Sequence, residues 1–103
     1  EKIEVECATL DDVADAIDLK VERVLLDNMS NESIAEAIRL IQSAETKGLR
    51  IQSEASGNMS LERVRSVAEL GVDFISVGAV SFKKKTADIS LLFDWQQTEM
   101  TGI

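Results

Sequence analysis

The sequence predicts an α/β fold of parallel βα repeats, either part of an α/β barrel or, in isolation, a half-barrel or open sheet. Segments with strand-like alternation take turns with segments of helical periodicity in the order β-α-β-α-β-α-β, followed by a loop and a last strand. Helices of about ten residues between strands imply right-handed crossovers and a parallel sheet. A closed barrel of eight such units needs roughly 200 residues or more, so residues 1–103 form a single α/β unit that cannot close one alone.

The first strand and helix are predicted from alternation and from a cap. Residues 2–7 alternate between charged and apolar side chains, which indicates a strand of about six residues with two unlike faces. Thr9 and Asp12 have the spacing of a capping box, so a helix starts after Thr9 and ends near Lys20. Its apolar stripe is predicted to consist of Leu10, Val13, Ala14 and Ile17.

The second repeat starts with the apolar run of residues 24–26, which ends in Asp27-Asn28. A helix follows, capped by Ser30 or Asn31, and Gly48 closes it as a left-handed C-terminal residue. One face of this helix is predicted to hold Ile34, Ala37, Ile38 and Ile41.

The third repeat begins with a strand over residues 50–55, and Ser60 caps a helix that runs to about Leu70. The next strand, residues 73–80, is rich in Phe, Ile and Val and is broken by a glycine. A last strand is predicted over residues 88–93. The inward residues of the third helix are predicted to be Leu61, Val64, Val67 and Ala68.

Composition and charge exclude several classes of function. With 19 acidic and 11 basic residues the formal charge is −8, which repels nucleic acid and favours a basic ligand, a metal ion or a metal-bound anion. No apolar run is long enough to span a membrane. The chain has one Cys, which excludes an internal disulfide. It has no His, which excludes a Cys/His zinc site and a Ser-His-Asp triad within the chain. Cys7 is expected to be a small buried apolar residue, because no His or cluster of cations lies near it in sequence.

The start of the sequence also carries an expectation about its origin. The chain begins with Glu1 inside an alternating pattern, without an initiator Met or a targeting segment. We therefore expect a part of a longer protein, located in the cytoplasm.

Side-chain parity predicts that each strand has one polar and one apolar face, because residues two apart share a face. The apolar faces, which would pack under the helices, hold Val5, Leu26, Ile51, Ala55, Ile75 and Val77. The other faces would line a polar interior or cleft, and they hold Glu4, Glu6, Leu25, Asp27, Gln52, Glu54, Ser56, Phe74, Ser76 and Gly78.

Three acids on the polar faces, Glu6, Asp27 and Glu54, fall near the C-terminal ends of their strands. Ligands bind at this edge in parallel α/β folds. Three neighbouring carboxylates repel one another unless a cation joins them, so Mg²⁺ or a developing cation in a substrate is a natural occupant. The residues alone leave open the alternative of three solvated acids at strand ends.

Two turns with glycine add a possible anion site. Ser56-Gly57-Asn58 opens the third helix, and Gly78-Ala79 follows the fourth strand. Glycine turns and helix N-termini expose backbone N–H groups, which hold phosphate in barrel enzymes. Ordinary turn chemistry explains the same residues, and the run of lysines at residues 83–85 fits a solvated loop better than an anion clamp.

Four segments in one order make the sequence similar to the quinolinate phosphoribosyltransferase family, also called nicotinate-nucleotide pyrophosphorylase (carboxylating). They are Lys2-Ile-Glu-Val-Glu6, Leu25-Leu-Asp-Asn-Met29, Glu54-Ala-Ser-Gly-Asn58 and Gly71-Val-Asp-Phe-Ile-Ser-Val-Gly78. The resemblance runs from about Lys2 to Phe93 and corresponds to the C-terminal part of that enzyme's barrel domain.

The resemblance implies a reaction of NAD biosynthesis. In it, the ring nitrogen of quinolinate displaces pyrophosphate from Mg²⁺-bound phosphoribosyl pyrophosphate, and decarboxylation then gives nicotinate mononucleotide and CO2. By position, Glu6 and Asp27 correspond to the family's catalytic acidic pair at the ribose and Mg²⁺, with Glu54 as their neighbour. The residues that correspond to the binding site of the 5′-phosphate are Ser56, Gly57, Asn58, Gly78 and Ala79.

Two departures from the family pattern limit what the chain does alone. Family members usually carry Thr-His-Ser where this chain has Ser81-Phe82-Lys83, so a polar or protonatable contact is missing at Phe82. The family's Arg, Lys and His residues for quinolinate lie upstream, with an Arg from a partner subunit. The resemblance thus implies a homo-oligomer, such as a homodimer, and an isolated chain without transferase activity.

Two alternatives remain open at this point. One is an excised or engineered half-barrel with an open flavodoxin-like sheet, which serves as a scaffold or weak phosphate-binding module without activity. The other is the molybdenum-transport-associated relative of the same family, although the Asp27-Asn28-Met29 and Glu54-Ala-Ser-Gly57 segments argue against it.

Overall fold

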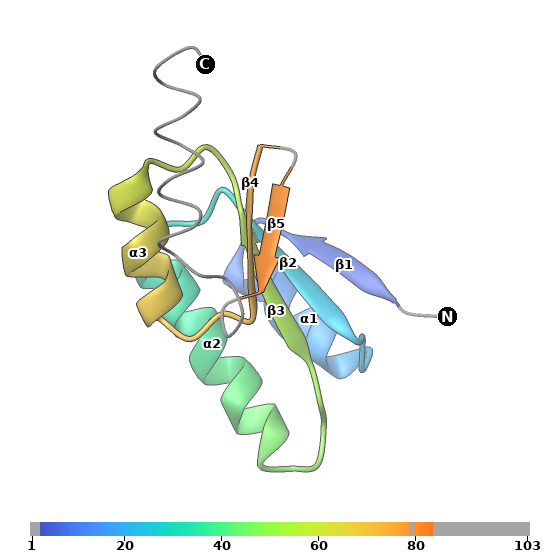
Figure 1. The fold of residues 1–103 in the computed structure, drawn as a ribbon. Coiled ribbons are helices and arrows are strands. Elements are labelled where there is room, and N and C mark those ends of the chain that lie inside the picture. The colour runs from blue at the N-terminus through green and yellow to red at the C-terminus, as the bar shows by residue number, and fades with distance from the viewer. Residues whose placement is uncertain (1–2, 79, 84–103) are drawn as a thin grey trace, which may run out of the picture.

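The computed structural model describes residues 3–78 and 80–83, which form a five-stranded sheet and three helices (Figure 1). The elements in chain order are β1 (Glu4–Cys7), α1 (Leu10–Asp18), β2 (Arg23–Asp27), α2 (Asn31–Glu45), β3 (Gln52–Ser56), α3 (Leu61–Glu69), β4 (Phe74–Val77) and β5 (Val80–Lys83). Within these residues, no helix combines the length and the apolar composition needed to cross a bilayer.

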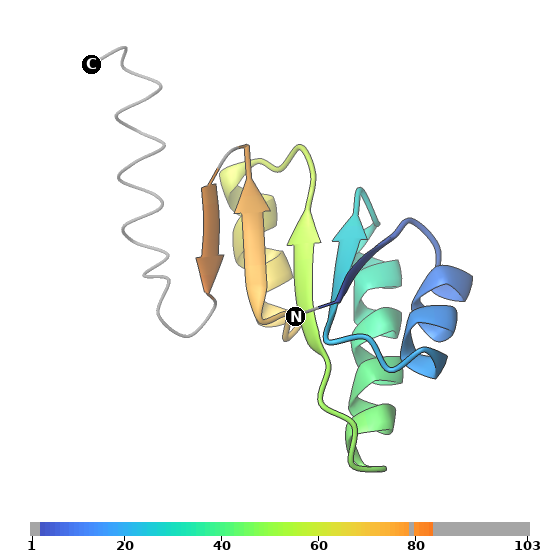
Figure 2. The same ribbon diagram turned by 90° about the vertical axis from the view of Figure 1, so that its right-hand side faces the viewer.

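The strand order in the sheet is the same as the order in the chain, β1-β2-β3-β4-β5. The first four strands pair in parallel, which confirms the predicted α/β class, and β5 pairs antiparallel with β4. Because each right-handed crossover steps to the next strand in one direction, all three helices lie on one face of the sheet (Figure 2). A flavodoxin-like sheet has the strand order 2-1-3-4-5 with helices on both faces. The alternative of an open flavodoxin-like sheet is therefore wrong in its strand order and in the placement of its helices.

The hydrophobic core lies between the sheet and the three helices. It contains the side chains that parity assigned to the helix-covered face: Leu26, Ile51, Ala55, Ile75 and Val77 are each at most 8% exposed, and Val5 packs against them. Burial of these aliphatic side chains is the main favourable contribution to folding of such a layer.

Caps define where the helices begin. The Thr9 hydroxyl accepts a bond from the Asp12 N–H, and the Asp12 carboxylate accepts one from the Thr9 N–H, so the predicted capping box is present. Ser30 rather than Asn31 caps α2, and Ser60 caps α3, each accepting from the third residue of its helix. The stripe predicted for α1 is wrong at one position, because Ala14 is exposed and Ala16 is buried.

The strand predicted over residues 73–80 is wrong in its second half. Gly78 adopts φ +60, a backbone conformation that reverses the chain, so β4 ends at Val77 and β5 returns as the second arm of a hairpin. Lys83 is therefore the last residue of a strand instead of part of a loop. The strand predicted over residues 88–93, together with Lys84 and Lys85, lies outside the described residues.

Candidate functional site

The face of the sheet opposite the helices carries polar residues in rows, because parallel strands place residues of equal register side by side. One row is Glu6, Leu25, Glu54 and Phe74, and the next row toward the C-terminal ends is Asp27, Ser56 and Ser76. This register brings the predicted site residues of three strands to one edge of one face. The predicted polar face is therefore a contiguous surface of the molecule.

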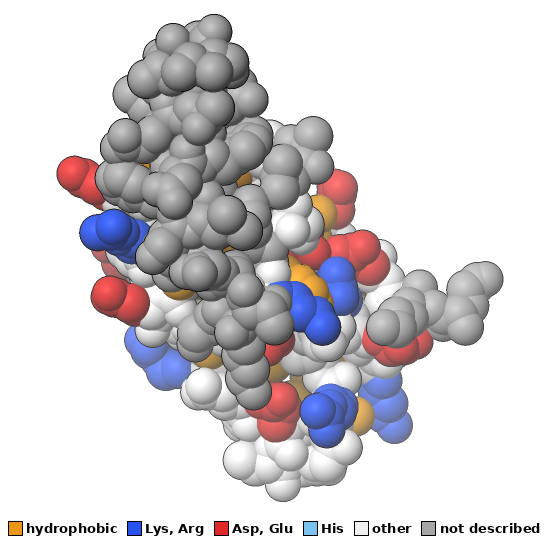
Figure 3. All heavy atoms as spheres, in the orientation of Figure 1, with side chains coloured by type: hydrophobic (Ala, Val, Ile, Leu, Met, Phe, Trp, Pro, Cys, Tyr) orange, Lys and Arg blue, Asp and Glu red, His pale blue; other side chains and the backbone are white. Residues whose placement is uncertain are grey.

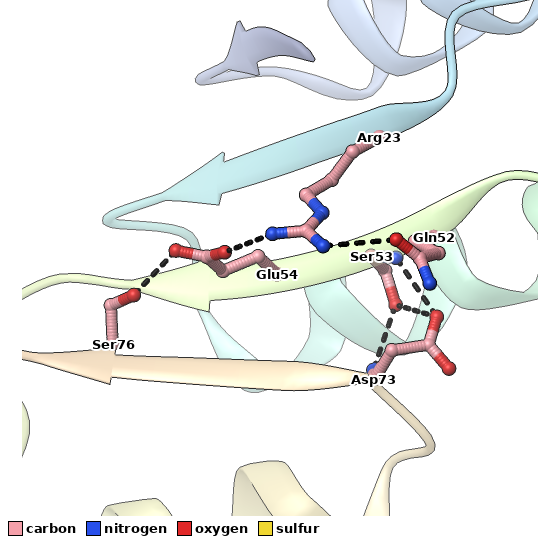
Figure 4. Close-up of polar contacts among 6 residues, drawn as sticks. All are labelled: Arg23, Gln52, Ser53, Glu54, Asp73 and Ser76. Carbon is pink, nitrogen blue, oxygen red and sulfur yellow. Dashed lines mark hydrogen bonds and ion pairs between the residues drawn. The ribbon is translucent and has the colours of Figure 1, made fainter. Parts of the chain in front are cut away.

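Glu54 is held by two neighbours (Figure 4). The Arg23 Nη1 group donates to Glu54 Oε1 at 3.2 Å, and the Ser76 hydroxyl donates to Glu54 Oε2. The Arg23 guanidinium also donates to Gln52 Oε1 at 2.9 Å and lies 3.9 Å from the centre of the Phe74 ring. Arg23, Glu54 and Ser76 belong to β2, β3 and β4, so these contacts join three neighbouring strands through their side chains, and Arg23 balances the charge of Glu54.

Asp27 and Glu6 occupy different positions on the polar face. Asp27 is half-buried at the end of β2, and its Oδ1 accepts a hydrogen bond from the Ser56 hydroxyl at 3.3 Å. Glu6 is exposed on β1 and lies opposite Leu25, so the two acids are diagonal neighbours on one face. In residues 3–78 and 80–83 no three acidic, His or Cys side chains gather closely enough to hold a metal ion. The structure thus does not unite Glu6, Asp27 and Glu54 in one cluster.

The turns after β2 and β3 touch each other. The Asn28 N–H donates to the Ser56 carbonyl at 3.0 Å, and Asn28 itself adopts φ +54. A Cβ on Gly57, whose φ is +140, would lie 2.5 Å from Asn28 Oδ1. Gly57 therefore leaves room for the Asn28 side chain, whose amide oxygen would have to move if residue 57 carried a Cβ.

The turn residues predicted to bind phosphate lie on one edge of the sheet. Ser56 is opposite Ser76 in the register, so the turns that follow β3 and β4 leave the sheet at neighbouring points. Asn58 and Gly78 are exposed there, and Ala79 lies outside the described residues. Backbone N–H groups in such turns are available donors for an anion.

Figure 3 shows that acidic and basic side chains alternate over the visible surface of the described residues. On the side shown, the coloured atoms form no broad field of one sign. Because the chain has a net charge of −8, phosphate binding would depend on local N–H and hydroxyl groups rather than on attraction to the chain as a whole.

Arg23 is the residue of this face that the sequence analysis missed. It shares the parity of Leu25 and Asp27, so the same alternation rule places its side chain on the polar face. Cys7, in contrast, is fully buried as predicted. Burial, followed by the nearby negative charge of Asp12, raises the pKa of its thiol, which makes it a poor nucleophile.

The chain is similar in sequence and in structure to one family of enzymes. The family described as quinolinate phosphoribosyl transferase, C-terminal domain, matches residues 1–92. The probable nicotinate-nucleotide pyrophosphorylase (carboxylating) of Synechocystis sp. is 40% identical over 89 residues, which are 86% of this chain and 29% of that protein. A chloroplastic nicotinate-nucleotide pyrophosphorylase (carboxylating) of Oryza sativa is 34% identical over 110 residues, covering 97% of this chain and 29% of the relative.

A solved structure is similar over the same region. The nicotinate-nucleotide pyrophosphorylase from Francisella tularensis superposes with a TM-score of 0.66 at 38% identity, and the match covers 77% of this chain and 26% of that one. The sequence thus spans about 29% of the length of the curated relatives it matches.

Proposed function

Because the chain belongs to the family of the quinolinate phosphoribosyl transferase C-terminal domain, we propose that it forms part of a phosphoribosyl-transferring enzyme. The proposed reaction joins quinolinate to phosphoribosyl pyrophosphate and yields nicotinate mononucleotide, CO2 and pyrophosphate, a step of NAD biosynthesis. The observation that carries this proposal is the row of Asp27, Ser56 and Ser76 at the carboxyl ends of three parallel strands, directly before the candidate turns. Ligands in parallel α/β folds bind at this edge.

The phosphoribosyl group is the part of the substrate that this chain would hold. The 5′-phosphate would accept hydrogen bonds from backbone N–H groups of Gly57 and Asn58, with Gly78 and Ala79 beside them. The Ser56 hydroxyl, which donates to Asp27 Oδ1 in the free chain, would turn to the phosphate when it binds. The N–H groups of a turn that opens a helix are suited to an anion, since the N-terminal end of the helix carries partial positive charge.

Glu6 and Asp27 would act on the ribose and its pyrophosphate. Mg²⁺ is commonly held by one or two carboxylates together with substrate phosphates and waters. One half-buried and one exposed acid on adjacent strands fit an ion that arrives with the pyrophosphate, rather than a cage made by protein alone. When bound, this ion would neutralise the charge of the leaving pyrophosphate. The carboxylate of Asp27 would stabilise the positive charge that develops on the ribose as the bond to pyrophosphate breaks.

The remaining groups would come from outside residues 1–103. A dianionic pyridine needs cationic donors, and we propose that they come from upstream residues and from a partner subunit of a homodimer. We propose a cytoplasmic location for such an enzyme, although the rice relative is named as chloroplastic.

The test is an NMR titration of the chain with nicotinate mononucleotide and Mg²⁺. Saturable shifts are expected at the amides of Gly57, Asn58, Gly78 and Ala79. The variant Ser56→Ala should weaken binding by about tenfold, since a hydroxyl bond to a charged group is lost. Ser43→Ala, on the exposed side of α2, is the matched control and should leave binding unchanged.

Either of two outcomes contradicts the proposal. One is the absence of shifts at these amides at millimolar nucleotide. The other is an equal loss of binding in Ser56→Ala and Ser43→Ala.

A further inference from the structure

A network of side chains joins the N-terminal turns of α2 and α3, which lie next to each other on the helical face (Figure 1). Arg63, on the first turn of α3, donates from Nε to Asn31 Oδ1 at 3.0 Å and from Nη2 to the carbonyl of Met29. Asn31 donates from Nδ2 to the Ser66 hydroxyl at 3.0 Å, and that hydroxyl donates to the Arg63 carbonyl at 2.9 Å. Arg63, Asn31 and Ser66 thus form a closed ring of hydrogen bonds, and Arg63 joins the Met29 carbonyl to it; we call these four residues the Arg63 network.

The Arg63 network connects the two turns that carry the candidate site. Met29 follows Asp27 and Asn28 in the turn after β2, and Arg63 belongs to the helix that follows the Ser56-Gly57 turn. The guanidinium is planar and presents several donors in a fixed geometry, so one side chain can bind a carbonyl and an amide oxygen at the same time. Arg63, Asn31 and Ser66 are all half-buried, which limits competition from water.

A second link joins the same turns on the side of the site. There the Asn28 N–H donates to the Ser56 carbonyl, and Gly57 lies against Asn28. With one link at the sheet edge and the other between the helices, the two turns are fixed in separation and in orientation. Groups that contact a reacting substrate must be held within a fraction of an ångström, so such support has a direct effect on function.

We propose that Arg63 is a positioning residue, which holds the turn after β2 against the turn after β3 and so fixes the Asn28–Ser56 contact. This inference rests on the proposed function only in its consequence for ligand binding. The contact itself is a property of the free chain and can be measured without any ligand.

Hydrogen exchange of the Asn28 amide in the 103-residue chain tests the proposal. Arg63→Met keeps most of the aliphatic length and removes the donors. It should speed exchange at Asn28 by about tenfold or more, the effect expected for loss of hydrogen bonds from a charged group. Exchange of amides inside β2, such as those of Val24 and Leu26, should change less. Arg63→Lys restores the charge without the fork of donors and should give an intermediate rate.

The matched control is Arg39→Met, which removes an exposed arginine paired with Glu36 at 3.2 Å within α2. It should leave exchange at Asn28 unchanged. The proposal is overturned if Asn28 exchanges at the wild-type rate in Arg63→Met, or if Asn28 and the β2 amides accelerate equally, since that result shows only a global loss of stability.

Ligand binding separates this inference from the proposed function. Titration with nicotinate mononucleotide should require several-fold more nucleotide in Arg63→Met than in wild type. A wild-type chain that binds no nucleotide contradicts the proposed function, and the exchange data then decide the role of Arg63 independently.

Discussion

The contact between Gly57 and the Asn28 side chain restricts which residue position 57 can hold. Gly57→Ala places a Cβ 2.5 Å from Asn28 Oδ1 at a backbone φ of +140, so it combines a steric clash with backbone strain. We expect a loss of about 1 to 3 kcal/mol in the free energy of unfolding, measured by chemical denaturation, because strained conformations cost this much.

A second glycine separates the contribution of the steric clash to this loss of stability from the contribution of backbone strain. Gly48→Ala also has positive φ, +91, but its Cβ would meet no atom within 4 Å. It should therefore show the cost of strain without the clash, and its effect should be the smaller of the two. Equal losses in Gly48→Ala and Gly57→Ala would show that Asn28 moves aside freely, and the tight turn would then have no role in fixing the site.

At the scale of elements, Arg23 connects three strands through side chains of the polar face. Its ion pair with Glu54 has side chains that are 25% and 12% exposed. Arg23→Met keeps apolar contact with the Phe74 ring and removes the donors to Glu54 and Gln52. The expected loss is about 1 to 3 kcal/mol of unfolding free energy, because a half-buried carboxylate loses a charged partner.

A double-mutant cycle with Glu54→Gln measures the coupling of this pair, which we expect to be about 1 kcal/mol. The pair of Arg39 and Glu36 is a matched control. It has the same 3.2 Å separation, but its side chains are 61% and 50% exposed. Its coupling should be below about 0.5 kcal/mol, since solvent screens exposed pairs. If the two pairs couple equally, burial on the polar face adds nothing to the Arg23 interaction.

Local patterns were sufficient to predict most of the elements. The capping box at Thr9, the cap at Ser60 and the alternation in β1 to β3 act over a few residues, so the sequence shows them directly. Ala14 was wrongly assigned to the buried face of α1, because packing against the core buries Ala16 and leaves Ala14 exposed. The β4–β5 hairpin was missed because a glycine within an apolar run permits either a bulge or a reversal.

Contacts between distant segments were beyond reach of the sequence. Parity placed Asp27, Ser56 and Ser76 on one face, and the register confirmed that they lie in one row. Parity does not say that Glu54 binds Arg23, nor that Asn28 lies against Gly57. These pairs are separated by 29 to 31 residues in the chain, and only the folded sheet brings them together.

At the scale of the whole molecule, the consecutive strand order leaves the helices on one face and the polar rows on the other. In a closed barrel such a second face would form the interior, and the residues at the carboxyl ends of its strands would form part of one wall of a site. The relatives are about three times longer than the matched region, which agrees with this geometry.

The last prediction concerns the activity of the 103-residue chain by itself. Quinolinate and pyrophosphate are both anions, whereas the chain has a net charge of −8, and the strands of the described polar face carry Glu4, Glu6, Asp27 and Glu54 against Arg23 and Lys83. Arg23 on that face is engaged by Glu54, so it cannot supply charge to a dianion without breaking the pair. We expect no nicotinate mononucleotide to form when the chain is incubated with quinolinate, phosphoribosyl pyrophosphate and Mg²⁺, and chromatography of the reaction mixture measures the product.

The same chain should nevertheless show the nucleotide-dependent shifts at Gly57 and Asn58, because the proposed phosphate-binding turns lie within it. Turnover by the purified chain above the rate of a Ser56→Ala, Asp27→Asn double variant would contradict the prediction that the chain binds nucleotide without catalysing the reaction. It would mean that cations other than Arg23, such as Lys83 on the same face, are sufficient for the anionic substrates.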